Sequence, residues 1–117
     1  MENIAYLEVD DFNSDGSIKS YVNNRKPIVL MAQATYCGYC KQAGPALEQF
    51  AKESPDLVVA TIVTDGETSE QQAAKFIKKW DSNHRGVPAY FGFSPDGKFV
   101  KLHTGGRDVA SLKKFSE

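Results

Sequence analysis

The chain has 117 residues and a formal net charge of −1. This length suits one domain with a real hydrophobic core, so we expect a single domain over residues 1–117. The nearly balanced charge, without runs of basic residues, argues against nucleic acid or a membrane surface as partner. No apolar run reaches the roughly 18 residues of a spanning helix. The N-terminus has no signal-peptide pattern, so we expect a cytoplasmic protein.

The first part of the chain predicts a strand, a short helix and a second strand. Residues 4–9 have strand composition, and residues 10–16 interrupt it before a weakly periodic segment around Tyr21. After Pro27, residues 28–32 form a continuous apolar run, which is typical of a parallel strand buried on both faces. We place this strand at the centre of the sheet. It leads directly to Cys37, which therefore lies at the carboxyl end of a strand, where open α/β sheets place their sites.

The middle of the chain predicts a helix, a strand and another helix. From Cys37 to residue 51, apolar residues recur at helical spacing, and Pro45 should kink this helix. Residues 57–63 are rich in β-branched residues and predict the second central strand. Thr68 and Gln71 have the spacing of a capping box, and the helix that they begin should run to Trp80.

The last part of the chain predicts a hairpin and a terminal helix. Residues 89–93 and 98–102 flank a segment whose proline and glycine suit a type I turn, so the two strands should be antiparallel neighbours. Asp108 can cap a final helix that carries Leu112 and Phe115. The predicted order is βαβαβαββα, an α/β fold with a central mixed sheet flanked by helices.

Cys37 and Cys40 are the only cysteines, and they have C-x-x-C spacing. Two thiols at this spacing at the start of a helix can close and reopen a disulfide with little backbone movement. The free N–H groups and the positive end of the helix dipole favour the thiolate form of Cys37. Cys40 lies one turn further along the helix and should be more shielded. The pair predicts redox chemistry with Cys37 as the reactive thiol.

A zinc site and a purely structural disulfide are the alternatives for this pair. A closed zinc site needs four ligands, and the other candidates, His84 and His103, lie too far apart in the sequence, so we expect no metal. A structural role is weak because closing so short a loop removes little entropy from the unfolded chain. We interpret both histidines as surface or packing residues.

Three motifs, in this order, resemble those of the thioredoxin superfamily, and the likeness covers nearly the whole chain. They are Cys37-Gly38-Tyr39-Cys40-Lys41, Pro45 inside the following helix, and Arg85-Gly86-Val87-Pro88 before a strand. The resemblance implies a thioredoxin fold in which the Val87–Pro88 bond is cis and lies opposite the cysteines. It also implies that the Val87 backbone pairs with a substrate chain.

The same resemblance implies a substrate-binding surface around the cysteines. Its residues are Tyr36, Gly38, Tyr39, Val87 and Pro88. Tyr36 and Tyr39 would shape an apolar rim, although a solvated loop aromatic is an equally good interpretation of Tyr39.

The motifs point to more than one subfamily. Gly38 is shared with the Cys-Gly-Pro-Cys of thioredoxins, and Tyr39 with the Cys-Pro-Tyr-Cys of glutaredoxins. The segment Gly105-Gly106-x-Asp108 resembles the one with which glutaredoxins hold glutathione. Followed by Leu112 and Phe115, the same segment with Arg107 looks equally like the end of a protein disulfide isomerase domain. The first strand and helix favour the thioredoxin or isomerase-domain interpretation.

Three positions depart from the thioredoxin pattern. Thioredoxins carry a buried acid six residues before the first cysteine and a lysine on the next strand that pairs with it. Here those positions are Met31 and Thr61. Losing both charges together is physically consistent, because either one alone would be stranded in the core. Tyr36 replaces the usual tryptophan.

The resemblance implies a thiol-disulfide oxidoreductase that exchanges the Cys37–Cys40 pair with protein disulfides. We expect no cofactor, and thioredoxin reductase or glutathione as the electron donor. One alternative is a glutathione-dependent, glutaredoxin-like reductase. The other is a binding module without catalysis, in which the dithiol only switches affinity for a partner.

Overall fold

Five strands form one mixed sheet in the order β1-β3-β2-β4-β5. The computed structural model describes all 117 residues and places β2 (Ile28–Gln33) at the centre, as predicted. β2 is parallel to β3 (Val58–Val63), which is parallel to β1 (Ala5–Tyr6). On its other side β2 is antiparallel to β4 (Ala89–Phe93), and β4 is antiparallel to β5 (Phe99–Leu102). The predicted fold class and hairpin are confirmed.

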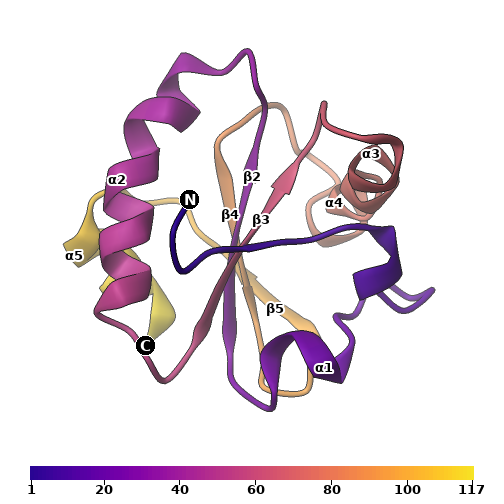
Figure 1. Cartoon of the computed structure of the whole chain (residues 1–117), viewed down its shortest axis with the longest axis horizontal. Coiled ribbons are helices and arrows are strands. Elements are labelled where there is room, and N and C mark those ends of the chain that lie inside the picture. The colour runs from indigo at the N-terminus through magenta and orange to yellow at the C-terminus, as the bar shows by residue number, and fades with distance from the viewer.

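Helices cover the sheet in two groups, which Figure 1 shows on opposite sides of the strands. The first group consists of α2 (Gly38–Lys52) and α5 (Val109–Ser116). The second consists of η1 (Val9–Asp11), α1 (Ser20–Asn23), α3 (Thr68–Ala74) and α4 (Ile77–Trp80). None of these helices has both the length and the apolar character to cross a membrane.

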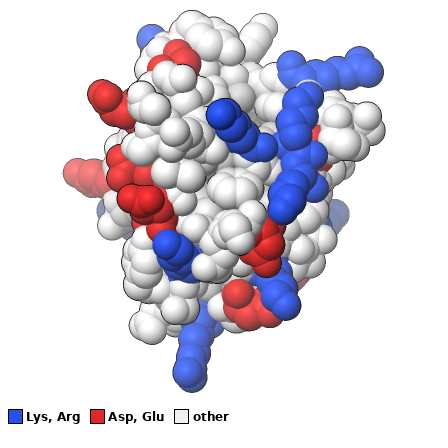
Figure 2. Space-filling view, turned by 90° about the vertical axis from the view of Figure 1, so that its right-hand side faces the viewer, with Lys and Arg blue, Asp and Glu red and all other residues white.

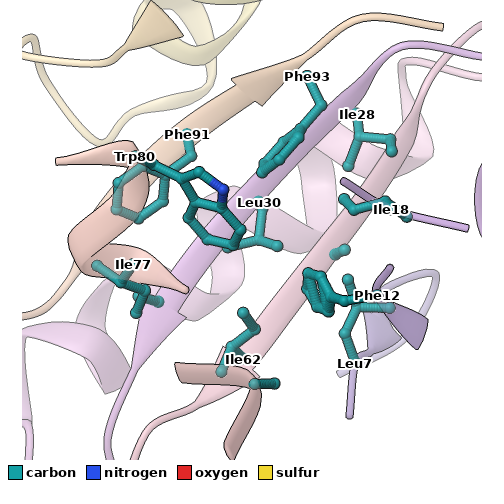
Figure 3. Close-up of a cluster of buried hydrophobic side chains, with 13 residues drawn as sticks. Leu7, Phe12, Ile18, Ile28, Leu30, Ile62, Ile77, Trp80, Phe91 and Phe93 are labelled. Atoms are coloured by element: carbon teal, nitrogen blue, oxygen red, sulfur yellow. The ribbon is translucent and has the colours of Figure 1, made fainter. Parts of the chain in front are cut away.

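The apolar run of β2 supplies both cores of the molecule. Leu30 and Ala32 belong to the cluster under the second helix group, which contains Trp80 and is drawn in Figure 3. Val29 and Met31 belong to the cluster under α2 and α5. Successive side chains of a strand point to opposite faces, so a strand covered on both faces is apolar at every position. Complete burial of such side chains stabilises the fold by roughly 1.5–3 kcal/mol each.

The first strand is shorter than predicted. Residues 4–9 suggested one strand, but β1 ends at Tyr6, and Val9 already belongs to η1. The backbone N–H of Glu8 donates to the Asp11 carboxylate at 2.8 Å, so this side chain replaces a strand partner and starts a turn. The prediction missed a local side-chain bond that competes with the sheet.

The helix predicted over residues 68–80 is two helices, α3 and α4. Around their junction the N–H of Phe76 donates to the Ala73 carbonyl, a tighter turn than that of an α-helix. The break lets the Phe76 ring stack on Phe12 at 5.3 Å between centroids. The predicted capping box is displaced by one residue, since Glu67 is the N-cap and its N–H donates to Glu70.

The other elements follow the prediction closely. α2 continues through Pro45 to Lys52, and the kink expected at Pro45 stays a prediction. In the β4–β5 turn the N–H of Gly97 donates to the Ser94 carbonyl at 2.9 Å, and Gly97 has a φ of +82°, which suits glycine. Asp108 occupies the N-cap position of α5, as predicted, but its carboxylate accepts no hydrogen bond from the helix backbone and instead accepts one from the Ser111 hydroxyl.

Tyr90 carries a polar atom that the core leaves unpaired. The residue is only 4% exposed, and its buried hydroxyl has no hydrogen-bond partner. Burial raises the pKa of this phenol, and the positive charge of Arg107 partly opposes the shift. The hydroxyl therefore stays protonated near neutral pH. Its burial carries a desolvation free energy that no hydrogen bond compensates.

Replacing Tyr90 with Phe should raise the free energy of unfolding by about 1 kcal/mol, because the unpaired hydroxyl is removed while the ring is kept. Urea denaturation measures the change. Tyr21→Phe is the control, since the Tyr21 hydroxyl donates to the Asp11 carboxylate and its loss should lower stability. A loss of stability in Tyr90→Phe would contradict the interpretation.

Candidate active site

Cys37 and Cys40 form a disulfide at the start of α2, with their Cα atoms 5.2 Å apart. Cys37 is the N-cap residue, so its side chain lies beside the free N–H groups of the first turn. Cys37 is 7% exposed and Cys40 is 2% exposed. The predicted greater shielding of Cys40 is confirmed. A reagent from solvent should therefore reach Cys37 first.

Two backbone groups face the sulfur of Cys37. The Cys40 N–H donates to Cys37 Sγ at 3.1 Å, and the carbonyl oxygen of Val87 lies 3.5 Å from the same sulfur. When the disulfide is reduced, this N–H and the positive end of α2 stabilise a thiolate at Cys37. The arrangement agrees with the prediction that Cys37 is the reactive thiol of the pair.

The Val87–Pro88 segment lies against the cysteines from the adjacent strand. It immediately precedes β4, the neighbour of β2, and the Val87 side chain packs on the small cluster of Ala34 and the two cysteines. The Val87–Pro88 peptide bond is cis, which confirms what the resemblance implied. The fold thus brings residues from positions 37–40 and 87–88 to one edge of the sheet.

The loop before Cys37 is held by Asp65, a residue that no sequence pattern marked as part of the site. Asp65 follows β3 and accepts hydrogen bonds from the backbone N–H of Thr35, at 2.8 Å, and from the Thr35 hydroxyl. Both bonds lower the pKa of Asp65. The bond from the hydroxyl has the larger effect, and the bond from the N–H follows. Its signal in the sequence was its place just beyond a strand parallel to β2.

Tyr36 and Tyr39 lie on the surface around the disulfide, 78% and 66% exposed. The Arg107 guanidinium lies over the Tyr39 ring, 5.5 Å from its centroid. Beside them is a pocket of about 290 Å³, lined by Tyr39, Gln42, Ala43, Ala46, Arg107 and Asp108. Gly38 is exposed, and a side chain there would meet open space. The edge that carries the disulfide is therefore an open surface with aromatic side chains rather than a deep cleft.

Met31 and Thr61 are direct neighbours across β2 and β3, as the comparison with the thioredoxin pattern required. Both are fully buried. The Thr61 hydroxyl donates to the Met31 carbonyl at 2.7 Å and accepts from the Gln33 side chain at 2.8 Å. The apolar Met31 side chain and the Thr61 hydroxyl stand where the thioredoxin pattern has an acid and a lysine, so these two positions bury no charge.

The two histidines pack against aromatic rings. His103 contacts the rings of Tyr90 and Phe115, and its Nε2 lies 2.6 Å from the Gly106 carbonyl oxygen. His84 faces Phe91, and burial lowers the pKa of His84, partly opposed by Asp81. The structure brings together no group of three or more His, Cys, Asp or Glu side chains that could hold a metal ion.

A C-x-x-C disulfide at a helix start, facing a cis-proline segment on a mixed sheet, defines a dithiol-disulfide domain of the thioredoxin type. The thioredoxin family model matches residues 8–117, and the chain belongs to the thioredoxin family. It is 33% identical to thioredoxin of Mycobacterium tuberculosis over 112 residues, which cover 95% of this chain and 86% of that one.

Similarity extends to a larger protein and to a solved structure. The chain is 27% identical to protein disulfide-isomerase erp38 of Neurospora crassa over 105 residues, 87% of this chain. It spans only 27% of the length of that isomerase. The crystal structure of thioredoxin F from spinach chloroplast has a TM-score of 0.71 at 21% identity, covering 97% of this chain and 89% of that chain. This last likeness concerns the fold alone.

Replacing Asp65 with Asn should destabilise the protein at neutral pH, because the Thr35 bonds lose a charged acceptor. The folded pKa of Asp65 lies below its ordinary value, so its contribution is present above the ordinary pKa and is lost as pH falls through the lower folded value. The stability gap between the wild type and Asp65→Asn should shrink below about pH 4. Denaturation at a series of pH values measures it. A gap that stays constant into strong acid would count against this role.

Proposed function

We propose that the protein is a thiol-disulfide oxidoreductase that exchanges its Cys37–Cys40 pair with disulfides of other proteins. The observation that carries the proposal is the position of Cys37 Sγ, which accepts the Cys40 N–H at the start of α2. This position lowers the cost of forming a thiolate at the one cysteine that solvent reaches more easily. Similarity to thioredoxins and to a protein disulfide-isomerase supports the same class of reaction.

The reaction consists of two thiol-disulfide exchanges. The Cys37 thiolate attacks one sulfur of a substrate disulfide, forming a mixed disulfide and releasing the other substrate sulfur as a thiolate. The Cys40 thiolate then attacks Cys37 Sγ, closes the Cys37–Cys40 disulfide and releases the second substrate sulfur. Two electrons pass to the substrate, which is reduced, while the cysteine pair is oxidised. No cofactor takes part in either step.

Substrate would bind along the edge that carries the disulfide. The backbone of Val87 would pair with an extended substrate segment beside Cys37, and Pro88 and Gly38 leave room for that chain to approach. Tyr36 and Tyr39 would contact its apolar side chains. A thioredoxin reductase or glutathione would return the oxidised pair to the dithiol form.

Cys37→Ser should abolish turnover in the reduction of insulin disulfides, whereas Cys40→Ser should still attack and accumulate a mixed disulfide, because only resolution is lost. Mass spectrometry of the trapped adducts distinguishes the two variants. Trapping of substrate on Cys40 in Cys37→Ser would reverse the assignment of the nucleophile. Reduction of insulin that stops after one equivalent, even with a reductant present, would instead indicate a redox-regulated binding module.

The glutathione-dependent alternative depends on Gly105, Gly106 and Asp108. Asp108 stands at the N-cap position of α5, and its carboxylate accepts a hydrogen bond from the Ser111 hydroxyl in the first turn, which favours a structural role at the helix start. Asp108→Ala should therefore lower stability while leaving the KM for glutathione mixed disulfides nearly unchanged. Steady-state kinetics and denaturation of the same sample measure both quantities. A large rise in KM at unchanged stability would support the glutaredoxin-like alternative.

A further inference from the structure

Four basic side chains gather on the side of the molecule that carries α3 and α4. Figure 2 shows this side, with blue side chains grouped at the upper right and red ones mainly to the left and below. Lys75 follows α3, Lys78 and Lys79 belong to α4, and Arg85 lies between α4 and β4. All four are exposed. We call this group the basic face; it forms only when the chain folds, because its members are spread over eleven positions of the sequence.

The charges of the basic face are free to act on a partner. The single ion pair of the molecule joins Lys113 to Glu53, on the opposite side of the sheet. The amino groups of Lys78 and Lys79 donate to the carbonyls of His84 and Asp15, which are neutral acceptors. These bonds hold the two side chains in place and do not neutralise their charge, although the nearby Asp15 carboxylate partly opposes that of Lys79. Lys75 and Arg85 make no hydrogen bond through their side chains within the protein.

The basic face continues to the edge that carries the disulfide. Arg85 lies two positions before Val87, whose carbonyl oxygen is 3.5 Å from Cys37 Sγ. Lys78 is tied to the same segment through its bond to the His84 carbonyl, at 3.2 Å. The Val87–Pro88 segment thus lies between Cys37 and these cations. A substrate protein that binds with its disulfide at Cys37 and extends across this segment would cover them.

We propose that the basic face docks an acidic surface next to the disulfide of a protein substrate. The inference rests on the proposed function and adds a class of substrate to it. Opposite charges around a reactive site speed the encounter of two proteins, and the effect weakens as salt screens them. Asp15 lies beside Lys79, and Asp81 lies near His84, as Lys78 does, so the basic face suits a folded protein of mixed charge better than a continuous phosphate backbone.

The test compares two variants of equal charge. The first carries Lys75→Gln, Lys79→Gln and Arg85→Gln; Lys78 is kept because it supports the segment before Val87. The control carries Lys52→Gln, Lys101→Gln and Lys114→Gln, which change the same charge around α2, β5 and α5. The substrates are a peptide with an internal disulfide and a glutamate-rich flank, and the same peptide with glutamine in place of glutamate.

At low ionic strength the first variant should lose about tenfold in kcat/KM for the glutamate peptide and keep its value for the glutamine peptide. The control should resemble the wild type, and added salt should remove the difference. Equal kcat/KM for both peptides in the wild type, or an equal loss in both variants, would overturn the proposal. Inhibition by single-stranded RNA stronger than by the reduced glutamate peptide would overturn it in favour of a phosphate-bearing partner.

The glutamine peptide separates this proposal from the one on which it rests. If the wild type reduces the glutamine peptide catalytically, the oxidoreductase proposal stands, whatever the charge variants do. If neither peptide is turned over, the proposed function fails, and the docking proposal fails with it.

Discussion

Burial of β2 on both faces is the constraint on which the rest of the structure depends. The strand pairs with β3 on one side and β4 on the other, and its apolar side chains enter both cores. If this strand slid by one residue relative to its neighbours, the side chains that enter one core would turn to the other face of the sheet. Its end is therefore fixed, and so is the start of α2 five residues later. The reactive position of Cys37 is a consequence of this register.

The site also needs contacts from the neighbouring strands. β3 brings Asp65 to the Thr35 loop, and β4 follows directly on the segment that carries Val87. Each contact joins residues that are 30 or 50 positions apart in the sequence. Parallel strands end at the same edge of a sheet, and a strand antiparallel to them begins at that edge. β2 and β3 therefore bring Cys37 and Asp65 to the edge at which β4 begins after Val87.

This explains which parts could be predicted from the sequence. The central strand, the C-x-x-C helix and the hairpin depend on local patterns, namely a continuous apolar run, a helix start and a turn with proline and glycine. The early end of β1 and the break after α3 depend on competing contacts, the Asp11 side chain in one case and Phe12 packing on Phe76 in the other. Asp65 escaped prediction because it meets Thr35, 30 positions away, only in the folded chain. The basic face escaped it because its four cations alternate with other residues and share one side only once α3, α4 and the segment after them have folded.

The core beneath the site is neutral, and the charges near the site lie on the surface. With Met31 and Thr61 in place of an acid and a lysine, no buried carboxylate is available on these strands to take a proton from Cys40. In the proposed reaction, resolution of the mixed disulfide would then depend on the ionisation of Cys40 itself or on water. The charges near the site lie on the surface, and those of the basic face, over α3 and α4, would act on an approaching partner and be screened by salt. Selection of a substrate can thus change at these side chains without altering the buried hydrogen bonds that support the cysteines.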